Sequence, residues 1–252
     1  MMMDKKERMI KILECLQEKQ MLELSDLMDK FAISKDTARR DILNLVEHGY
    51  AEKIRGGITL PKIKERIENY EERLIKHSLA KQKIARLATQ YMKDNQVIWL
   101  DVSTTVQLLA EHVQAPQLLF VTNSLDNALT FSKYNYEVFL LGGFFQKDSH
   151  LLKGSVTFSQ IDSFHFDIAF LGASGMDEQS LFYSEIDDIS FHEMIINNSD
   201  ITCLLVDHTK FHNQGNFKMS LEGIDYVITD ATIPESIRNS LEHKGIKWTI
   251  GE

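Results

Sequence analysis

The chain has 252 residues, of which 43% are hydrophobic and 26% charged, which is typical of a folded globular protein. It contains no apolar run of eighteen residues, so the sequence predicts no membrane span. Residues 1–60 carry 11 Lys and Arg against 11 Asp and Glu, so the formal net charge of −9 lies wholly in residues 61–252. That acidic part is a poor partner for nucleic acid, whereas the neutral first part leaves DNA binding open.

Cysteine usage and the first residues indicate the compartment. Cys15 and Cys203 lie in apolar segments without a CxxC partner, as expected for reduced core thiols. The charged start, from Met1 to Glu7, lacks the apolar core of a secretion signal. We therefore expect a cytoplasmic protein without a membrane partner.

Three amphipathic helices are predicted in the first fifty residues. The first opens at Asp4 with Glu7 as capping-box partner, and the third begins after the N-cap Ser34 and runs to about His48. The apolar stripe of the first helix is Met9, Ile12, Leu13 and Leu16, and that of the second is Leu24, Leu27, Met28 and Phe31. On the third, Ala38, Ile42 and Leu45 point inward.

The opposite face of the third helix is polar. Asp36, Arg40 and Asn44 point outward there, flanked by Thr37 and Arg39. After the helix, residues 51–59 contain two short extended pieces around a basic tip. Three helices and a basic hairpin form the winged helix-turn-helix pattern, although such heads also serve as dimerisation or peptide-binding modules.

The order of residues favours DNA binding. Ile33-Ser34-Lys35-Asp36-Thr37-Ala38-Arg39-Arg40-Asp41-Ile42, followed by Arg55-Gly56-Gly57, resembles the DeoR family of bacterial transcription regulators. In that family the stretch reads Val-Ser-x-x-Thr-Ile-Arg-Arg-Asp-Leu with an (Arg/His)-Gly-Gly wing. Ala38 departs from the family isoleucine, which should thin the packing between helices.

The chemistry of these side chains gives each an expected role. Arg39 and Arg40 bind phosphate or guanine, and either assignment is open. The N-terminal end of the helix favours phosphate. Asp41 is expected to pair with a neighbouring arginine. The predicted DNA-binding residues are Ser34, Lys35, Asp36, Thr37, Arg39, Arg40, Asn44, Arg55 and Gly56.

The rest of the chain is expected to hold a charged connector and a second domain. We place the winged helix-turn-helix domain at 1–59, the connector at 60–75 and an effector-binding and oligomerisation domain at 76–252. The second domain starts with a helix that is apolar on one side. Its apolar residues are Leu79, Ile84, Ala85, Leu87, Ala88 and Tyr91.

Seven short apolar runs follow, most of them separated by stretches of helix length. This alternation predicts a mostly parallel α/β sheet. The predicted strands are Val97–Leu100, Leu118–Val121, Val138–Leu141, Asp167–Leu171, Ile201–Val206, Tyr226–Thr229 and Lys247–Ile250.

Five of these strands end in polar or glycine-rich loops. Ligands of open α/β sheets bind at the carboxyl ends of the strands, so the five loops predict one pocket for a small phosphorylated polyol. Lys210 would supply charge, and Asp101 or Asp207 would accept bonds from sugar hydroxyls. The predicted effector-binding residues are Asp101, Ser103, Thr104, Thr105, Thr122, Asn123, Gly142, Gly143, Gly172, Asp207 and Lys210.

The same loops resemble the DeoR effector domain, which is similar in fold to sugar-phosphate isomerases and whose effectors are typically phosphorylated sugars. Ser103 replaces a family glycine, which would stiffen the loop or tilt an amide. Where the family has a glutamate and then a basic helix segment, this chain has Asp187-Asp188 and then His192. The resemblance thus leaves the basic residue near the ligand missing or replaced by His192.

Two other functions have less support in the sequence. His208 and His212 are four residues apart but follow a strand, so no metal site and no cofactor are predicted. A sugar-phosphate isomerase needs a base beside the substrate carbon. Related isomerases have an Asp-Gly-Ala-Asp-Glu loop where this chain has Gly172-Ala173-Ser174-Gly175, with Asp177-Glu178 following. We therefore expect no catalytic residues.

The sequence as a whole predicts a transcriptional regulator. The expected partners are double-stranded operator DNA, a phosphorylated sugar effector and further copies of the chain in a dimer or tetramer. The expected action is repression of a sugar-metabolism operon that the effector relieves.

Overall fold

The structure is a computed structural model, and it describes residues 5–19, 21–47, 50–54, 56–59, 78–147 and 149–251. It divides into two compact units, Met1–Ile67 and Glu68–Glu252. The predicted N-cap Asp4, the wing residue Arg55 and the connector 60–75 lie outside the described residues.

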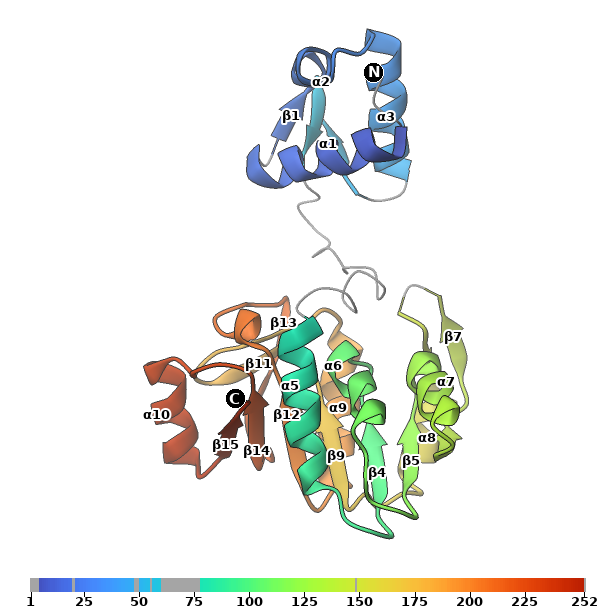
Figure 1. Cartoon of the computed structure of the whole chain (residues 1–252), viewed down its shortest axis with the longest axis vertical. Coiled ribbons are helices and arrows are strands. Elements are labelled where there is room, and N and C mark those ends of the chain that lie inside the picture. The colour runs from blue at the N-terminus through green and yellow to red at the C-terminus, as the bar shows by residue number, and fades with distance from the viewer. Residues whose placement is uncertain are drawn as a thin grey trace. The chain divides into compact units, whose positions relative to one another are not determined.

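The N-terminal unit has three helices and a three-stranded antiparallel sheet (Figure 1). The three predicted helices are confirmed as α1 (Lys5–Lys19), α2 (Leu24–Phe31) and α3 (Lys35–Glu47). The predicted hairpin is confirmed as β2 (Glu52–Ile54) and β3 (Gly57–Thr59), in the order β1-β3-β2. The strand β1 (Met21–Glu23) was not predicted, and it places Leu22 opposite Ile58.

The apolar stripes of the helices form the core of this unit. Ile12, Leu16, Leu27, Ala38 and Leu45 are each at most 1% exposed, as the 3.6-residue period requires. The helix α2 begins with a capping box in which the Glu23 and Asp26 side chains pair with each other's backbone N–H. It ends at Ala32, whose φ of 50° is left-handed.

The second unit is built on one sheet of seven strands in which every neighbouring pair is parallel. Its order is β15-β14-β12-β9-β4-β5-β6. These are the seven predicted strands, shifted by up to one residue at their ends. They are β4 (Val97–Leu100), β5 (Leu119–Thr122), β6 (Glu137–Leu140), β9 (Ile168–Leu171), β12 (Thr202–Leu205), β14 (Tyr226–Thr229) and β15 (Lys247–Ile250).

Helices cover both faces of this sheet and make a three-layer α/β unit. Ile98 and Leu100 contribute to the core on one face and Trp99 to the core on the other, because successive strand residues alternate. One face carries α5 (Ser78–Ala88), η1 (Thr89–Tyr91), α6 (Thr104–Gln107), η2 (Leu108–Glu111) and α7 (Leu125–Lys133). The other carries α8 (Ser155–Ile161), α9 (Ile186–Asn197) and α10 (Glu235–Lys244).

Leu79 corrects one prediction. It was expected on the apolar side of its helix, but it is 77% exposed at the first turn of α5. The stripe that packs on the sheet starts with Ile84 and Ala85, both fully buried. The first turn of α5 therefore extends beyond the layer that the sheet supports.

Two small antiparallel sheets were not predicted. One pairs β7 (Phe144–Gln146) with β8 (Leu151–Lys153), and the other has the order β10-β11-β13. Its strands are β10 (Gly175–Met176), β11 (Ser180–Tyr183) and β13 (Phe217–Ser220). Because β7, β10 and β13 follow the carboxyl ends of β6, β9 and β12, both sheets start from the edge where the pocket was predicted.

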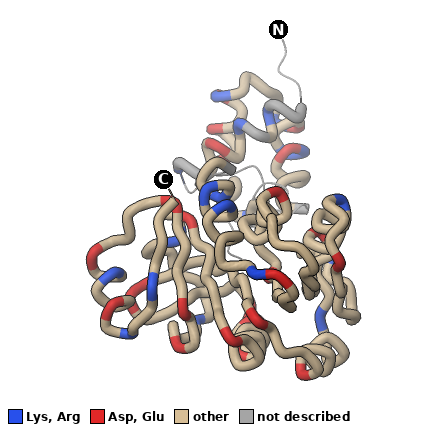
Figure 2. Tube along the Cα trace, turned by 60° about the horizontal axis from the view of Figure 1, so that its bottom comes forward, with Lys and Arg blue, Asp and Glu red and all other residues tan. Residues whose placement is uncertain are grey.

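Acidic residues are spread over the second unit. Figure 2 shows Asp and Glu distributed around the second unit rather than gathered at one place. No helix in the described part of the chain is both long and apolar enough to cross a membrane. Cys15 and Cys203 are buried and unpaired.

Candidate functional site

The polar face of α3 is the candidate DNA interface. Lys35, Asp36, Arg39 and Arg40 are exposed on it. Thr37 and Asn44, also predicted to contact DNA, are half-buried at its margins. The arginines therefore project from the side of α3 opposite its apolar stripe.

Local chemistry fixes where α3 begins. The Ser34 hydroxyl accepts the backbone N–H of Thr37 at 3.2 Å and lies 2.9 Å from the Thr37 hydroxyl. This confirms Ser34 as the N-cap, an interaction worth about 1 kcal/mol. The remaining free N–H groups of the first turn face the same end as Lys35, an arrangement that favours phosphate.

A buried ion pair fixes the position of α3 against α1. The Arg8 Nε donates to Asp41 Oδ2 at 2.7 Å, and the two side chains are 10% and 2% exposed. Asp41 thus pairs with an arginine, as expected, and this arginine is Arg8 on another helix rather than Arg39 or Arg40. Arg39 and Arg40 lie on the outer face, where the helical period places them.

The backbone of the wing requires glycine at positions 56 and 57. A Cβ built on Gly57 would stand 2.0 Å from the Leu22 carbonyl oxygen, so the approach of β1 requires glycine there. Gly56 adopts a φ of +95° at an exposed turn, which glycine tolerates best. Its carbonyl accepts the Leu24 N–H at 2.8 Å, so the wing is held to the start of α2.

In the second unit, the polar strand ends gather around Asp101. Asp101 follows β4 and is 6% exposed, and its Oδ2 accepts the Gly172 N–H at 2.9 Å. The Asn127 amide donates to the Asp101 carbonyl at 2.8 Å, and the Thr122 hydroxyl donates to the carbonyl of Leu100 at 2.7 Å. The loops after β4, β5 and β9 are therefore joined by hydrogen bonds, as their parallel order requires.

A buried histidine is the side-chain partner of Asp101. His192, on α9, is 5% exposed and places Nε2 3.2 Å from Asp101 Oδ2. Burial opposes the charge on His192, but Asp101 outweighs burial and raises the pKa of His192. Burial likewise disfavours the Asp101 carboxylate, but His192 and the N–H groups of Gly172 and Val102 lower its pKa below the ordinary value. Each member of the pair therefore favours the charged form of the other.

Ser103 fits this loop without strain. Its φ of −138° is extended, and its hydroxyl caps α6 by accepting the Thr105 N–H at 3.2 Å. The replacement of a family glycine therefore fills the loop and partners one amide that a ligand could have used. Gly172 allows this, since a Cβ there would stand 2.8 Å from the Ser103 Cβ.

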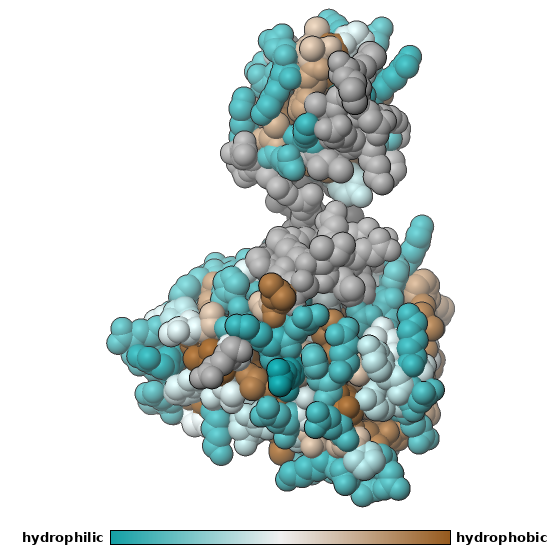
Figure 3. All heavy atoms as spheres, viewed as in Figure 1, coloured by the Kyte–Doolittle hydropathy of each residue, from teal (hydrophilic) through white to brown (hydrophobic). Residues whose placement is uncertain are grey.

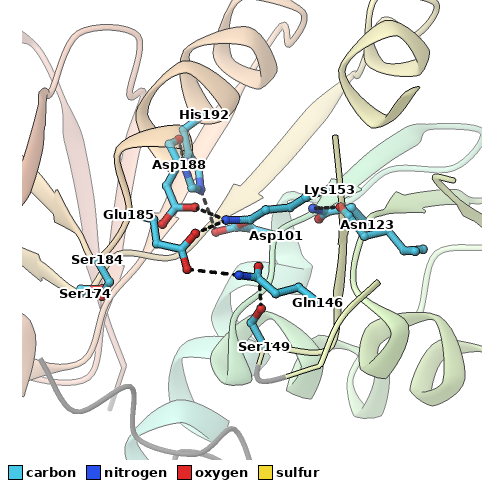
Figure 4. Close-up of polar contacts among 11 residues, drawn as sticks. Asp101, Asn123, Gln146, Ser149, Lys153, Ser174, Ser184, Glu185, Asp188 and His192 are labelled. Carbon is cyan, nitrogen blue, oxygen red and sulfur yellow. Dashed lines mark hydrogen bonds and ion pairs between the residues drawn. The ribbon is translucent and has the colours of Figure 1, made fainter. Parts of the chain in front are cut away.

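A second group of charges stands beside the first, and sequence reasoning missed most of it. Lys153, at the end of β8, donates to Glu185 at 2.5 Å and to Asp188 at 3.3 Å (Figure 4). Burial lowers and the two carboxylates raise the pKa of Lys153, with a net increase. The Gln146 amide of β7 also donates to Glu185, at 3.5 Å. We call Asp101, Lys153, Glu185, Asp188 and His192 the polar cluster.

Buried polar atoms without partners adjoin the polar cluster. Among the described residues, Asn123 Oδ1 and Tyr183 Oη are buried and have no hydrogen-bond partner. The Tyr183 ring stacks on His192 at 4.4 Å, and burial together with Asp101 and Asp188 raises its pKa well above the usual value. Unpartnered buried polar atoms are costly, so they mark a place that a ligand or water completes.

Most of the other predicted effector residues lie in the loops near the polar cluster, whereas Asp207 has a separate structural role. Thr104 and Thr105 start α6 and are buried. Gly143 lies so close to the Lys153 carbonyl oxygen that a Cβ would stand 2.7 Å from it. Gly142 donates its N–H to Gln160 at 2.7 Å. Asp207 instead caps η3 (His208–Lys210) by accepting the Thr209 N–H at 2.9 Å.

Lys210 is half-buried at the end of η3, and no hydrogen bond or ion pair in the described part of the chain joins it to the polar cluster. His192 was singled out in the sequence, but Lys153 and Glu185 were not. Glu185 stands two residues after β11, so a strand end was its only sequence signal. No group of three or more His, Cys, Asp or Glu side chains within the described ranges could hold a metal ion.

Comparisons with known proteins identify both units. A family model described as the DeoR-like helix-turn-helix domain matches residues 8–64, and one described as the DeoR C terminal sensor domain matches residues 76–231. The chain is 31% identical over 252 residues to the HTH-type transcriptional repressor GlcR of Bacillus subtilis, covering 99% of this chain and 98% of that protein.

Two further similarities were found. The glycerol-3-phosphate regulon repressor of Escherichia coli is 28% identical, covering 95% of this chain and 96% of its own. Among solved structures, ribose 5-phosphate isomerase from Plasmodium falciparum has 17% identity and a TM-score of 0.39, covering 54% of each chain.

Proposed function

This chain belongs to the DeoR family of transcriptional regulators. On that premise we propose that it is a repressor and that a phosphorylated sugar lowers its affinity for operator DNA. The observation that carries the proposal is the difference between its two candidate sites. One unit presents exposed arginines on a helix held by the Arg8–Asp41 pair, and the other encloses charged groups and unpartnered polar atoms.

For operator binding we propose that α3 enters the major groove and that the wing contacts backbone phosphates. The exposed Arg39 and Arg40 suit phosphate or the guanine edge. Asp36 lies between Lys35 and the arginines and would discourage binding to phosphate alone. A regulator that reads chromosomal DNA works in the bacterial cytoplasm.

For the effector we propose the polar cluster as the binding site. Lys153 is the cation best placed for an anionic group, because it already binds two carboxylates in the polar cluster. A phosphate would replace Glu185 and Asp188 on Lys153, with the start of α6 as a second source of donors. Asp101, His192 and the unpartnered Asn123 Oδ1 would bind sugar hydroxyls.

The proposed role is sensing without catalysis. The acidic residues that follow the β9 loop serve elsewhere: Asp177 accepts the N–H groups of Gln179 and Ser180 in a turn, and the Glu178 backbone carbonyl accepts the Ser240 hydroxyl. Asp101 is the remaining carboxylate at that loop, and it is paired with His192. Incubation of the purified protein with pentose and hexose phosphates tests the point, and turnover would contradict it.

The two activities need only modest coupling. A free energy of about 1–3 kcal/mol, or 5–150-fold in operator affinity, is enough for a regulatory response. We further propose that the chain acts as a dimer or tetramer, so that two heads read repeats about 10 bp apart or a multiple of that spacing.

A thermal-unfolding screen tests the effector proposal. The full chain is heated with a panel of phosphorylated and unphosphorylated sugars, and we expect a phosphorylated sugar to raise the melting temperature. Lys153→Ala should remove that rise, whereas Lys244→Ala, at an exposed lysine of α10, should not. A rise that survives Lys153→Ala would contradict the role of Lys153, and a rise only with unphosphorylated sugars would contradict the ligand class.

A further inference from the structure

An apolar surface lies along the free edge of the seven-stranded sheet. It consists of Phe139 and Leu140 on β6, Phe144 and Phe145 on β7, and Val156 on α8, and we call it the β6–β7 surface. The exposed fractions of these side chains are 43%, 36%, 80%, 53% and 50%. Figure 3 shows apolar residues gathered along the side of this unit that bears β7.

The β6–β7 surface wraps around the outer edge of the sheet rather than lying on one face of it. Phe139 and Leu140 are successive residues of β6, so their side chains point to opposite faces at that edge. A Cβ built on Gly154, just before α8, would stand 3.2 Å from the Phe144 ring, so β7 lies against the start of α8. Val156 borders Gly142, whose Cβ would stand 4.0 Å from the Val156 Cγ1. Gly142 in turn follows the end of β6 by two residues.

The outer edge of β6 adds backbone N–H and C=O groups to this surface. β6 pairs with β5 on one side, and no strand in the described ranges pairs with its other side. Edge strands of monomers are normally protected by Lys, Pro or a covering segment. β6 reads Glu-Val-Phe-Leu, with one charge at its first residue and two exposed apolar side chains.

The size of the surface matches half of a protein interface. With about 200 Å² for a phenylalanine side chain, the five residues expose roughly 500 Å² of apolar area. A stable interface buries about 800 Å² per partner, of which about 60% is apolar. The aromatic content and the near absence of charge are also typical of an interface core.

We propose that the β6–β7 surface binds the same surface of a second copy of this chain. A two-fold axis at β6 would place the two edge strands antiparallel, so that each supplies the backbone partners that the other lacks. The sheets of two sensor units would then be continuous, with the phenylalanines of β7 packed on either side of the axis.

Sedimentation velocity of the full chain tests this, without DNA or sugar, from nanomolar to tens of micromolar concentration. We expect a dimer or a larger even-numbered assembly, and we expect Phe144→Ser with Phe145→Ser to weaken it roughly tenfold or more. Both side chains are mostly exposed, so the folded unit should keep its melting temperature. Val156→Glu, which keeps the aromatic rings and adds a charge, should weaken association as well.

Leu79→Ser is the matched control, since Leu79 is 77% exposed on α5, outside the β6–β7 surface, and should leave association unchanged. A wild-type monomer at the highest concentration would overturn the proposal. So would an assembly that resists both surface variants. The proposal rests on the oligomer proposed above, and the two fail differently: a monomer would contradict both, whereas an assembly that resists the surface variants would contradict this interface alone.

Discussion

The two candidate sites of this protein are built in opposite ways. On α3, the basic side chains project from a helix whose other face is core, and Arg39 and Arg40 support none of the packing that holds the unit together. In the sensor unit, the charged side chains are paired with one another in partial or complete burial. The head therefore separates binding from stability, whereas the polar cluster joins them.

This difference has a consequence for regulation. A ligand that enters the polar cluster must exchange partners with existing ion pairs, so its binding can change the position of α9 and of the β7–β8 hairpin. DNA binding to the face of α3 requires no such exchange. We therefore expect the conformational change that couples sugar binding to DNA binding to start at the ion pairs of the polar cluster.

The largest effect is expected at a buried pair within the head itself. Asp41→Ala removes the buried carboxylate that accepts from the Arg8 guanidinium, which should destabilise the N-terminal unit by about 3–5 kcal/mol. Denaturant unfolding followed by circular dichroism measures this, with the exposed Asp36→Ala on the same helix as control. If the two variants were equally stable, burial of the aspartate would not decide how much its loss destabilises the fold.

A smaller effect on a different quantity is expected at Arg40. Arg40→Ala should lower operator affinity by about 1–3 kcal/mol, roughly 5–150-fold, through loss of a base or phosphate contact. The melting temperature and its rise with sugar should not change, because the side chain is exposed. Fluorescence anisotropy with labelled operator checks the affinity. Unchanged affinity would remove α3 as the reading helix.

Lys153 and Lys210 are expected to differ in how much they contribute to sugar affinity. Lys153 lies in the polar cluster and Lys210 at the end of η3, so Lys153→Met should reduce sugar affinity by about tenfold and Lys210→Ala by less. Isothermal titration calorimetry measures both, while operator affinity without sugar serves as the control and should stay constant. A larger loss with Lys210→Ala would restore the sequence prediction that Lys210 supplies the charge.

The smallest expected effect is a pH dependence. The raised pKa of His192 contributes stability that is complete below the ordinary value of 6.5 and is lost as pH rises through its folded-state pKa. The lowered pKa of Asp101 contributes stability that is present above 3.8 and is lost as pH falls through its folded-state value.

Thermal unfolding, measured from pH values below the folded-state pKa of Asp101 to values above that of His192, checks the prediction. His192→Gln should abolish the loss of stability on the alkaline side, and His243→Gln, at an exposed position of α10, should preserve it. An identical alkaline loss in the His192 variant would mean that the pair with Asp101 does not stabilise the fold.

The sequence predicted the seven-stranded sheet because parallel strands buried on both faces read as apolar runs. Three of its strands, β4, β14 and β15, have the predicted bounds. It did not predict β7 or β10, since Phe144–Gln146 is exposed and Gly175–Met176 is too short to show a period. Such pieces are strands only because tertiary contacts place a partner beside them.

The same distinction holds for the sites. Arg39 and Arg40 were found because helical period alone decides which side of α3 they occupy. Lys153 was not, since its partner Glu185 lies 32 residues away and no spacing rule connects them. Asp207 shows what a sequence pattern leaves out, because a polar residue at a strand end predicts a ligand contact but does not reveal that its carboxylate caps the next turn.

The most direct test of the division of labour is selection of DNA by the full-length chain. Random duplexes are captured at low ionic strength, by the wild type and by Arg40→Ala, with and without the sugar found in the thermal screen. We expect the wild type to enrich one motif in repeats spaced by about one helical turn or a multiple. Arg40→Ala should capture less of that motif, and the sugar should reduce capture by the wild type. No enrichment by the wild type, or equal capture of the motif by the Arg40 variant, would contradict the account.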